Sequence, residues 1–309
     1  MNIYDYVVSD EMDGERLDVY LSLLLEDKSR SYIQKLIKSG NVSVIRSDKP
    51  ILKIKNSCIL SENDKVQVEV PDITMPTIEA ENIDLDIIYE DDDILIVNKP
   101  KEMVVHPAAG HYTHTLVNGL LYHCKNLSGI NGVMRPGIVH RIDMNTTGAL
   151  IVCKNDYSHK FIAEQLAKHS ITRKYEGIVH GVFDNEAGTV EGAIGRDKND
   201  RKKMAIDLKN GKPAITHYKV IKNYKNHAHL EFQLETGRTH QIRVHMKSIN
   251  HPLLGDDIYG SGKSKIKNLK GQCLHARIIG FIHPTTGKYV EFEAPLPKYF
   301  IDILEKSSL

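Results

Sequence analysis

The first 70 residues carry apolar side chains first at helical and then at strand-like spacing. Leu17, Leu21 and Leu24 recur at i, i+4 and i+7, which predicts an amphipathic helix that opens near Glu15. A second helix is predicted from Ser29 as N-cap to an end at Gly40. Its inward side chains are expected to be Ile33, Leu36 and Ile37. Alternating valines then predict two short strands, over residues 42–44 and 66–70.

The rest of the chain is richer in strand patterns. Residues 71–83 contain two prolines and no periodicity, which indicates a linker. Beyond it we expect a helix capped by Asp156 and a second helix built on Ile242, Met246 and Ile249. The expected strands are a hairpin over 87–100 and single strands over 148–155, 172–183, 228–235 and 290–297. No βαβ unit repeats, so the pattern predicts an α+β fold with a mixed sheet.

Length and composition place the chain in a broad class. Its 309 residues suffice for about two domains, and we expect a small domain over 1–72, a linker over 73–83 and a larger domain over 84–309. Hydrophobic residues make up 41% and charged residues 26%, as in soluble globular proteins. No apolar run reaches the roughly 18 residues of a membrane-spanning helix, and the N-terminus lacks a secretory pattern.

The four cysteines lie far apart in the chain and form no C-x-x-C pair: Cys58, Cys124, Cys153 and Cys273. This spacing favours reduced thiols in a cytoplasmic protein over a four-thiolate zinc site. His240 and His245 likewise lack a third ligand at metal-site spacing, so we do not interpret them as metal ligands.

The net charge is only +1, but charge is distributed unevenly along the chain. Residues 28–55 carry eight basic side chains and one acid, whereas residues 73–98 carry eight acids and no base. Residues 196–203 add a second basic cluster. Separate basic faces are typical of nucleic-acid binders, and we interpret residues 28–55 in this way. The acidic stretch is interpreted as solvated surface.

Two segments combine charged side chains with turns at strand ends. IVHRIDMNTTG places His140, Arg141 and Asp143 in a polar turn in front of a buried strand, and LETGRTHQIRVHM places Arg238 directly after a Thr-Gly turn. Such residues could form a charge-paired nucleophile on a nucleic-acid surface. From composition alone, a structural salt bridge explains them as well, and both interpretations stay open.

The motif HRIDMNTTG resembles the H-R-L-D-x-x-T-S/T-G signature of the RluA-type pseudouridine synthases, with Ile142 in place of the usual leucine. Segments similar to that family surround it in the same order: NKPKEMVVHPAAG, RPGIVHR, TRKYEGIVHG, GRDKNDRKKMA, ETGRTHQIRVHM, HPLLGDDIYG and LHARIIGFIHPTTGK. They cover residues 84–309 almost continuously. In front of them, ERLDVYLSLLL, SRSYIQKLIKSGNVSV and ENDKVQVEV resemble the S4 RNA-binding domain.

The resemblance implies the pseudouridine synthase fold, a mixed and largely antiparallel sheet, and the RluD branch, whose substrate is large-subunit ribosomal RNA. It also implies roles for four residues. Asp143 matches the catalytic aspartate, and Arg238 matches the basic residue that pairs with it. Tyr175 matches the tyrosine that packs on the target base and is implicated in removing the proton from C5. Arg141 matches the arginine that replaces the flipped nucleotide. No cofactor or metal is implied.

The expected partner is RNA, either naked or within pre-ribosomal particles, bound by a monomer without a membrane. His140 is expected to contact the RNA beside Arg141, and His240 and His245 are expected to contact the RNA or to be structural. The other expected contacts are basic residues of the two clusters: Arg30, Lys35, Lys38, Arg196, Arg201, Lys202 and Lys203.

Two further functions stay open at this point. A ribosome-assembly factor could use the same surfaces without turnover, although a chain without turnover need not keep Asp143, Tyr175 and Arg238 together. A nucleoside hydrolase would release free uracil, although the sequence shows no second carboxylate placed to activate water. The uridines modified, and the chemical route that Asp143 follows, are not specified by these motifs.

Overall fold

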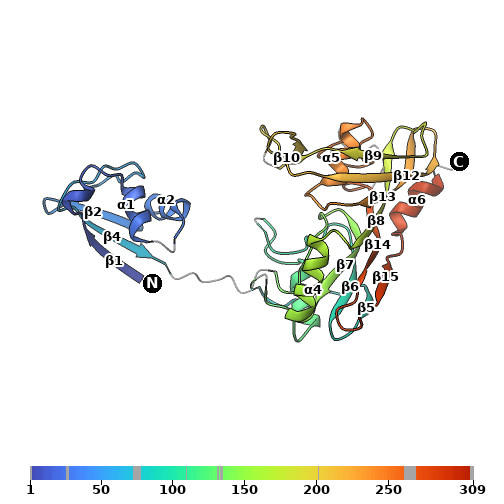
Figure 1. Ribbon diagram of the computed structural model, residues 1–309, viewed down its shortest axis with the longest axis horizontal. Coiled ribbons are helices and arrows are strands. Elements are labelled where there is room, and N and C mark those ends of the chain that lie inside the picture. Colours follow the sequence, from blue (N-terminus) through green and yellow to red (C-terminus); the bar gives the residue numbers. More distant parts are fainter. Residues whose placement is uncertain are drawn as a thin grey trace. The chain divides into compact units, whose positions relative to one another are not determined.

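The computed structural model describes residues 2–25, 28–71, 78–108, 110–130, 132, 135–200, 202–260 and 269–306 (Figure 1). The chain divides into two compact units, residues 1–75 and 76–309, which we call unit 1 and unit 2. Their boundary lies inside the expected linker. Residues 78–83 nevertheless belong to unit 2, because Ile78 packs on its core and the Asn118 side chain donates to the Glu79 main-chain oxygen at 2.8 Å.

Unit 1 packs two helices on one face of a four-stranded antiparallel sheet, in the strand order β1-β4-β2-β3. Its elements are β1 (Asn2–Val7), η1 (Asp10–Met12), α1 (Leu17–Leu24), α2 (Arg30–Lys38), β2 (Val42–Arg46), β3 (Lys49–Pro50) and β4 (Lys65–Val70). Both predicted helices are confirmed, and the Ser29 side chain caps α2 by accepting from the Tyr32 amide at 3.3 Å. Strand β1 had no prediction.

One detail of the predicted apolar stripe is wrong. Leu24 was expected to face inward with Leu17 and Leu21, but it is exposed, and Leu25 is buried instead. Leu25 lies four residues after Leu21, and its amide still donates to the Leu21 main-chain oxygen at 3.0 Å, so its side chain shares the inward face of α1.

Unit 2 is built on a nine-stranded mixed sheet, with a separate two-stranded hairpin of β10 and β11. The main sheet runs β5-β6-β7-β14-β8-β13-β12-β9, and β15 pairs with β14. Only β7 and β14 are parallel neighbours among the described strands; all other pairs are antiparallel, which confirms the predicted sheet. The strands are β5 (Ile87–Glu90), β6 (Ile94–Lys99), β7 (Thr147–Cys153), β8 (Thr172–His180), β9 (Ala187–Glu191), β10 (Ile194–Arg196), β11 (Met204–Ile206), β12 (Ile215–Asn223), β13 (His227–Leu234), β14 (Leu274–Ile282) and β15 (Tyr289–Glu293).

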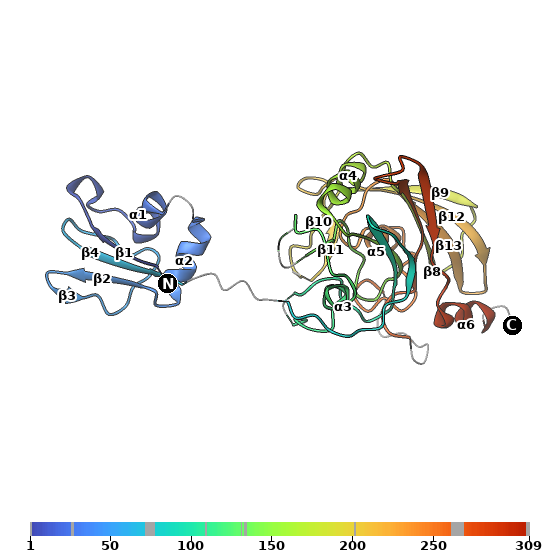
Figure 2. The ribbon, with the colours of Figure 1, turned by 90° about the horizontal axis from the view of Figure 1, so that it is seen from below.

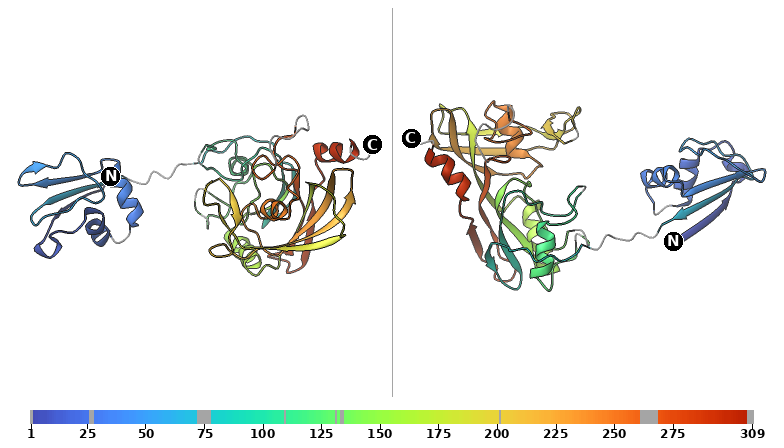
Figure 3. Two further views of the ribbon diagram at one scale, coloured as in Figure 1. Left: turned by 90° about the horizontal axis from the view of Figure 1, so that it is seen from above. Right: turned by 180° about the vertical axis from the view of Figure 1, so that it is seen from behind.

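Helices lie on both faces of the sheet. They are α3 (Leu116–His123), α4 (Asp156–Ala167), α5 (Gln241–Ser248) and α6 (Lys298–Lys306). Figure 2 shows α5 beside β8, β9, β12 and β13, and Figure 3 shows α6 on the other side of the sheet. The alternation of strand residues explains this arrangement, because Val179 packs toward α5 and its neighbour Ile178 packs toward α6. The cap of α4 is Asn155 rather than the predicted Asp156, which is the first helical residue.

The junction of β7 and β14 fixes where the motif HRIDMNTTG ends. Gly148 pairs with Ala276 in parallel register, and a Cβ on Gly148 would lie 2.2 Å from the Ala276 oxygen. Only glycine allows this close approach, and its φ of +109° is open only to glycine in practice. The turn that carries Asp143 is thereby held at the end of two central strands. Within the described residues, no helix has the length and apolar character needed to cross a membrane.

Candidate active site

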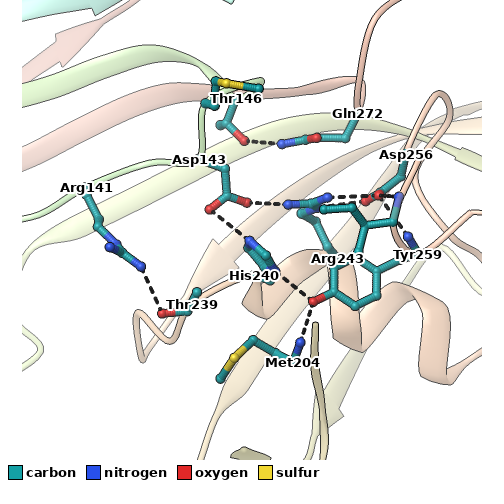
Figure 4. Close-up of polar contacts among 12 residues, drawn as sticks. Arg141, Asp143, Thr146, Met204, Thr239, His240, Arg243, Asp256, Tyr259 and Gln272 are labelled. Carbon is teal, nitrogen blue, oxygen red and sulfur yellow. Dashed lines mark hydrogen bonds and ion pairs between the residues drawn. The ribbon is translucent and has the colours of Figure 1, made fainter. Parts of the chain in front are cut away.

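Asp143 lies in a turn immediately before β7, where the Thr146 amide donates to its main-chain oxygen at 3.0 Å. Its side chain is half-buried, with 23% of its surface exposed. Arg243 Nη1 donates to Asp143 Oδ2 at 3.0 Å, and His240 Nε2 lies 3.7 Å from Asp143 Oδ1 (Figure 4). The carboxylate is therefore held from one side and open on another.

The predicted pairing of Arg238 with Asp143 is wrong. Arg238 Nε instead donates to the main-chain oxygen of Pro213 at 3.0 Å, and Arg243 supplies the ion pair. The reason is the position of α5. Arg238 precedes the helix, where its amide bonds to the Gln241 side chain at 2.9 Å, whereas Arg243 lies in the first turn beside the buried Ile242. The sequence signal for Arg243 was its place in the helix that the spacing of Ile242 and Met246 predicts.

Arg243 is itself fixed by a second carboxylate. Its Nε and Nη2 donate to the two oxygens of Asp256 at 2.7 and 2.9 Å, and Asp256 also accepts from the amides of Ile258 and Tyr259 at 3.0 Å. Burial favours the neutral acid, but the Arg243 guanidinium outweighs it and holds the pKa of Asp256 below its usual range. Because Nε and Nη2 are bonded to Asp256, Nη1 remains to donate to Asp143. Asp256 thus orients the donor that Arg243 presents to Asp143.

His240 is oriented by Tyr259. The Tyr259 hydroxyl accepts from the Met204 amide at 2.7 Å and lies 2.7 Å from His240 Nδ1 (Figure 4). Because the hydroxyl hydrogen is then available for Nδ1, the hydrogen of the imidazole is placed on Nε2, which faces Asp143. Burial lowers the pKa of His240, so the ring is neutral at pH 7. Sequence reasoning had not assigned Asp256 or Tyr259 to the site.

Tyr175 and Arg141 complete the surroundings of Asp143. A cavity of about 60 Å³ is lined by Asp143, Tyr175, Arg141, Arg238 and Arg243, together with apolar residues of β13 and β14. An adjoining cavity of about 270 Å³ shares three of these residues. Tyr175 is buried on β8, and burial raises the pKa of its hydroxyl. The structure therefore brings together all four residues to which the family resemblance assigned a role.

The two residues in front of Asp143 differ in their contacts. Arg141 is exposed and reaches Thr239 Oγ1 at 3.4 Å. His140 Nε2 accepts from the Ile151 amide at 2.9 Å, and burial lowers its pKa to about 3. The expectation that His140 contacts RNA is thus weakened, because the ring is neutral and its Nε2 is occupied by a strand amide.

Lys99 supports the same turn from inside. Its ammonium is buried and donates to three main-chain oxygens, those of Pro100, Met103 and Met144, at 2.7 to 3.0 Å. Burial lowers the pKa of Lys99 to about 7. The contact with Met144 ties the residue after Asp143 to the end of β6.

The basic residues expected to bind RNA lie in different environments. Lys35, Lys38, Arg196 and Lys202 are exposed, and Lys203 lies 3.6 Å from Asp200. Arg30 differs from the expectation of a free phosphate ligand, because its Nη2 donates to the buried Asp18 at 3.0 Å. Arg201 lies outside the described residues.

One group of three described side chains brings metal-type ligands together outside these cavities. Ligand atoms of Glu90, His123 and Cys124 lie within 4.8 Å of one another. Lys154 Nζ already donates to Glu90 at 2.8 Å, and burial raises the pKa of the Cys124 thiol to about 11. A cation would have to displace the ammonium and a thiol proton, so this group fits an ion pair better than a metal site.

Comparisons with known proteins agree with this geometry. The profile of a family described as RNA pseudouridylate synthase matches residues 93–248. The chain is 50% identical over 305 residues to the uncharacterized RNA pseudouridine synthase YlyB of Bacillus subtilis, covering 99% of this chain and 98% of the relative. It is 47% identical to ribosomal large subunit pseudouridine synthase D of Zymomonas mobilis, covering 94% and 93%.

A solved structure shares the fold. Human RNA pseudouridylate synthase domain containing 1 aligns with a TM-score of 0.57 at 23% identity, over 74% of this chain and 96% of that chain. A match this distant in sequence bears on the fold alone, and it agrees with the mixed sheet of unit 2. Together with the near-complete coverage of the bacterial relatives, these findings show that the chain belongs to the RNA pseudouridine synthases of the RluA/RluD family.

Proposed function

We propose that this RNA pseudouridine synthase acts on specific uridines of large-subunit ribosomal RNA, which it flips out of the RNA, and that Asp143 acts at the sugar. One observation carries the proposal. The half-buried Asp143 carboxylate is held by Arg243 on one oxygen, inside a cavity that Tyr175 also lines. The ribosomal substrate is supported by relatives such as ribosomal large subunit pseudouridine synthase D of Zymomonas mobilis.

The chemistry requires a carboxylate in this setting. Isomerisation breaks the bond between uracil N1 and the sugar, turns the base, and joins the sugar to C5. Positive charge develops on the sugar carbon as N1 leaves, and an ionised carboxylate can attack that carbon or stabilise its charge. Arg243 Nη1 pairs with Asp143 Oδ2 at 3.0 Å, so a fixed guanidinium orients the carboxylate. Tyr175, buried across the cavity, is the candidate base for the C5 proton.

The position of the cavity supports base flipping. A uridine inside a helix cannot reach Asp143 without leaving its stack, which costs a few kcal/mol. Arg141 is exposed at the cavity and bonded only loosely to Thr239, so it is free to fill the space that the uridine leaves. We assign it this role.

Unit 1 supplies the second part of the proposal. Its two helices packed on a small antiparallel sheet carry Lys35 and Lys38 on the exposed side of α2. We propose that unit 1 is an S4-like RNA-binding domain that adds affinity for RNA phosphates. The uridine chemistry is assigned to unit 2.

The variant Asp143→Asn tests the central assignment. The amide is nearly isosteric but carries no charge, so the full-length variant should form no pseudouridine on a large-subunit rRNA transcript while binding it like wild type. Asp92→Asn, which alters an exposed side chain between β5 and β6, is the matched control and should retain activity. Turnover by the purified Asp143→Asn variant, free of host enzyme, would refute the role of Asp143. Free uracil in the wild-type reaction would indicate hydrolysis instead.

The substrate needs a separate measurement. Pseudouridine mapping of total RNA from a strain that lacks this protein should show lost sites in large-subunit ribosomal RNA. Losses confined to transfer RNA would overturn the ribosomal assignment and leave the chemistry of Asp143 untouched.

A further inference from the structure

Arg173 is a buried guanidinium that contacts no carboxylate among the described residues. Only 8% of the residue is exposed. Its Nη2 donates to the main-chain oxygen of Glu235 at 3.1 Å, and its Nε is buried without a hydrogen-bond partner. Arg243 and Arg277, by contrast, each contact two carboxylates. Arg173 therefore differs from these two arginines in having no carboxylate partner among the described residues.

An unpaired buried charge is costly, because the protein interior replaces only part of the solvation that water gives. Burial is the largest influence on Arg173 and lowers its pKa. One hydrogen bond to a main-chain oxygen could be made by a neutral side chain. We therefore look for a negative charge near Arg173 that forms only during the reaction.

The position of Arg173 identifies where that negative charge forms. Arg173 and Tyr175 are two residues apart on β8, so their Cα atoms lie about 7 Å apart and their side chains leave the strand on the same side. Both are buried, and Tyr175 lines the cavity with Asp143. Arg173 does not line that cavity, so it acts on a bound uridine through Tyr175.

We propose that Arg173 is a positioning residue that stabilises the phenolate of Tyr175 during removal of the C5 proton. This inference rests on the proposed function, because it requires Tyr175 to act as the base. Its effect is electrostatic and leaves the work of Asp143 at the sugar unchanged.

The step that Arg173 assists is balanced in atoms and electrons. Once C5 is joined to the sugar carbon, C5 still carries its hydrogen, and N1 forms a double bond with C6. The Tyr175 phenolate takes the C5 proton, and the C5–H electron pair forms the C5=C6 double bond. The N1=C6 pair moves to N1, which takes a proton from water or from the Tyr175 hydroxyl. Each turnover therefore needs an ionised Tyr175 in a buried position.

The other charges near Tyr175 show why Arg173 is needed. Burial and the Asp143 carboxylate both raise the pKa of Tyr175, and Arg173 lowers it. Arg238 adds positive charge on the cavity side. His140 also lies near Arg173, but with a pKa of about 3 it is neutral at pH 7. Arg173 is thus the cation that opposes burial at this position.

The test compares Arg173→Met, Arg173→Lys and the control Lys174→Met in the full-length protein. Lys174 is the next residue on β8 and pairs with Glu231 on the opposite side of the strand. Single-turnover rates are measured against pH on an rRNA transcript that carries either ordinary or 5-deuterated uridine. Circular dichroism and RNA affinity report whether each variant is folded.

Removing the charge should slow the proton transfer specifically. We expect the single-turnover rate of Arg173→Met at pH 7 to be lower by about tenfold or more. The rising limb of its pH–rate profile should shift up by about one pH unit, because the positive charge that lowers the phenol pKa is gone. Its deuterium isotope effect should exceed that of wild type. Arg173→Lys should restore most of the rate, and the control should match wild type.

The contrary results are distinct from a failure of the proposed function. Two results would show that Arg173 only holds the turn at Glu235. One is a folded Arg173→Met variant with the wild-type rate. The other is a slow variant whose pH–rate profile is unshifted and whose isotope effect is no larger than that of wild type. Should Arg173→Met not fold, 3-fluorotyrosine at position 175 keeps the arginine and lowers the phenol pKa. The rising limb must then move to lower pH. An unmoved limb would exclude Tyr175 as the base while leaving the assignment of Asp143 intact.

Discussion

Two aspartates that bind arginine behave differently in the two units. Asp18 of unit 1 is fully buried, and Arg16, Arg30 and Gln34 all donate to it at 2.8 to 3.4 Å. Asp143 of unit 2 keeps 23% of its side chain exposed and has one donor within 3.0 Å. A carboxylate whose two oxygens both accept hydrogen bonds stabilises a fold, whereas one with an oxygen free of a close donor can react. Asp18 and Asp143 differ in the number of side chains that donate to them.

The arginines differ in the same sense. Arg16 and Arg30 are about half-exposed and reach inward to Asp18, so when one of them is lost the other still pairs with the buried carboxylate. Arg243 is almost fully buried and serves Asp143 and Asp256 together. Unit 1 therefore uses exposed cations to neutralise one buried acid, and unit 2 uses one buried cation to hold two acids.

The largest expected effect follows from removing Arg243. Arg243→Met leaves Asp256 buried without its partner and Asp143 without its ion pair, so we expect a loss of about 3–5 kcal/mol in unfolding free energy. The single-turnover rate should fall about a hundredfold or more. Arg243→Lys should rescue little, because an ammonium cannot fork onto Asp256 while serving Asp143. Denaturant unfolding and rapid-quench kinetics measure the two effects.

Arg238→Met is the matched variant for that measurement. Arg238 lines the same cavity but bonds to the main chain at Pro213, so its loss should slow the reaction less than the loss of Arg243. Equal losses from both arginines would mean that bound RNA rearranges the ion pair of Asp143.

A smaller effect is expected from Asp18→Asn. The amide cannot accept all three donors, so unit 1 should lose about 1–3 kcal/mol of stability, with unchanged single-turnover chemistry at saturating RNA. Native-state hydrogen exchange of α1 and α2 amides in the full-length protein measures this loss. Asp48→Asn, at a side chain that is 92% exposed, is the control and should leave exchange unchanged. A slower chemical step in the Asp18→Asn variant would show that unit 1 helps to orient the uridine.

The smallest effect should come from neutralising the exposed lysines of α2. Lys35→Gln combined with Lys38→Gln should weaken RNA binding and flatten the slope of log K against log salt by about 1.4–1.8, which corresponds to two phosphate contacts. The chemical step should not change. A salt slope equal to that of wild type would remove both residues from the RNA interface.

Local patterning predicted much of the architecture. The periodicity of unit 1 located α1 and α2, and Ser29 was identified as a cap from its residue type and position. At element ends, Leu24 and Asp156 were each misplaced by one residue. Sequence patterns locate element ends only to within one or two residues, so an inward residue or a cap can be shifted by one position. Other elements had no prediction: β1, β3, β9, β10, β11, β12, β14, α3 and α6.

The candidate site could be predicted only in part. The motif around Asp143 and the strand that carries Tyr175 were identified from the sequence and its family resemblance. The partner of Asp143 was not, because two arginines stand in the segment ETGRTHQIR and only the start of α5 selects between them. The contact of Arg30 with Asp18 was also missed, because Asp18 belongs to another helix, and only the packing of α1 on α2 brings the two side chains together.

The sequence by itself determined the α+β class, the aspartate motif and those helices and strands whose apolar residues recur regularly, because these depend on residue types at short, regular spacing. The tertiary structure decided which charges meet. Asp143 and Arg243 are 100 residues apart, and Asp256 and Tyr259 reach them from a further segment. The strength of such pairs depends on distance and burial, and both are fixed only when distant segments pack together.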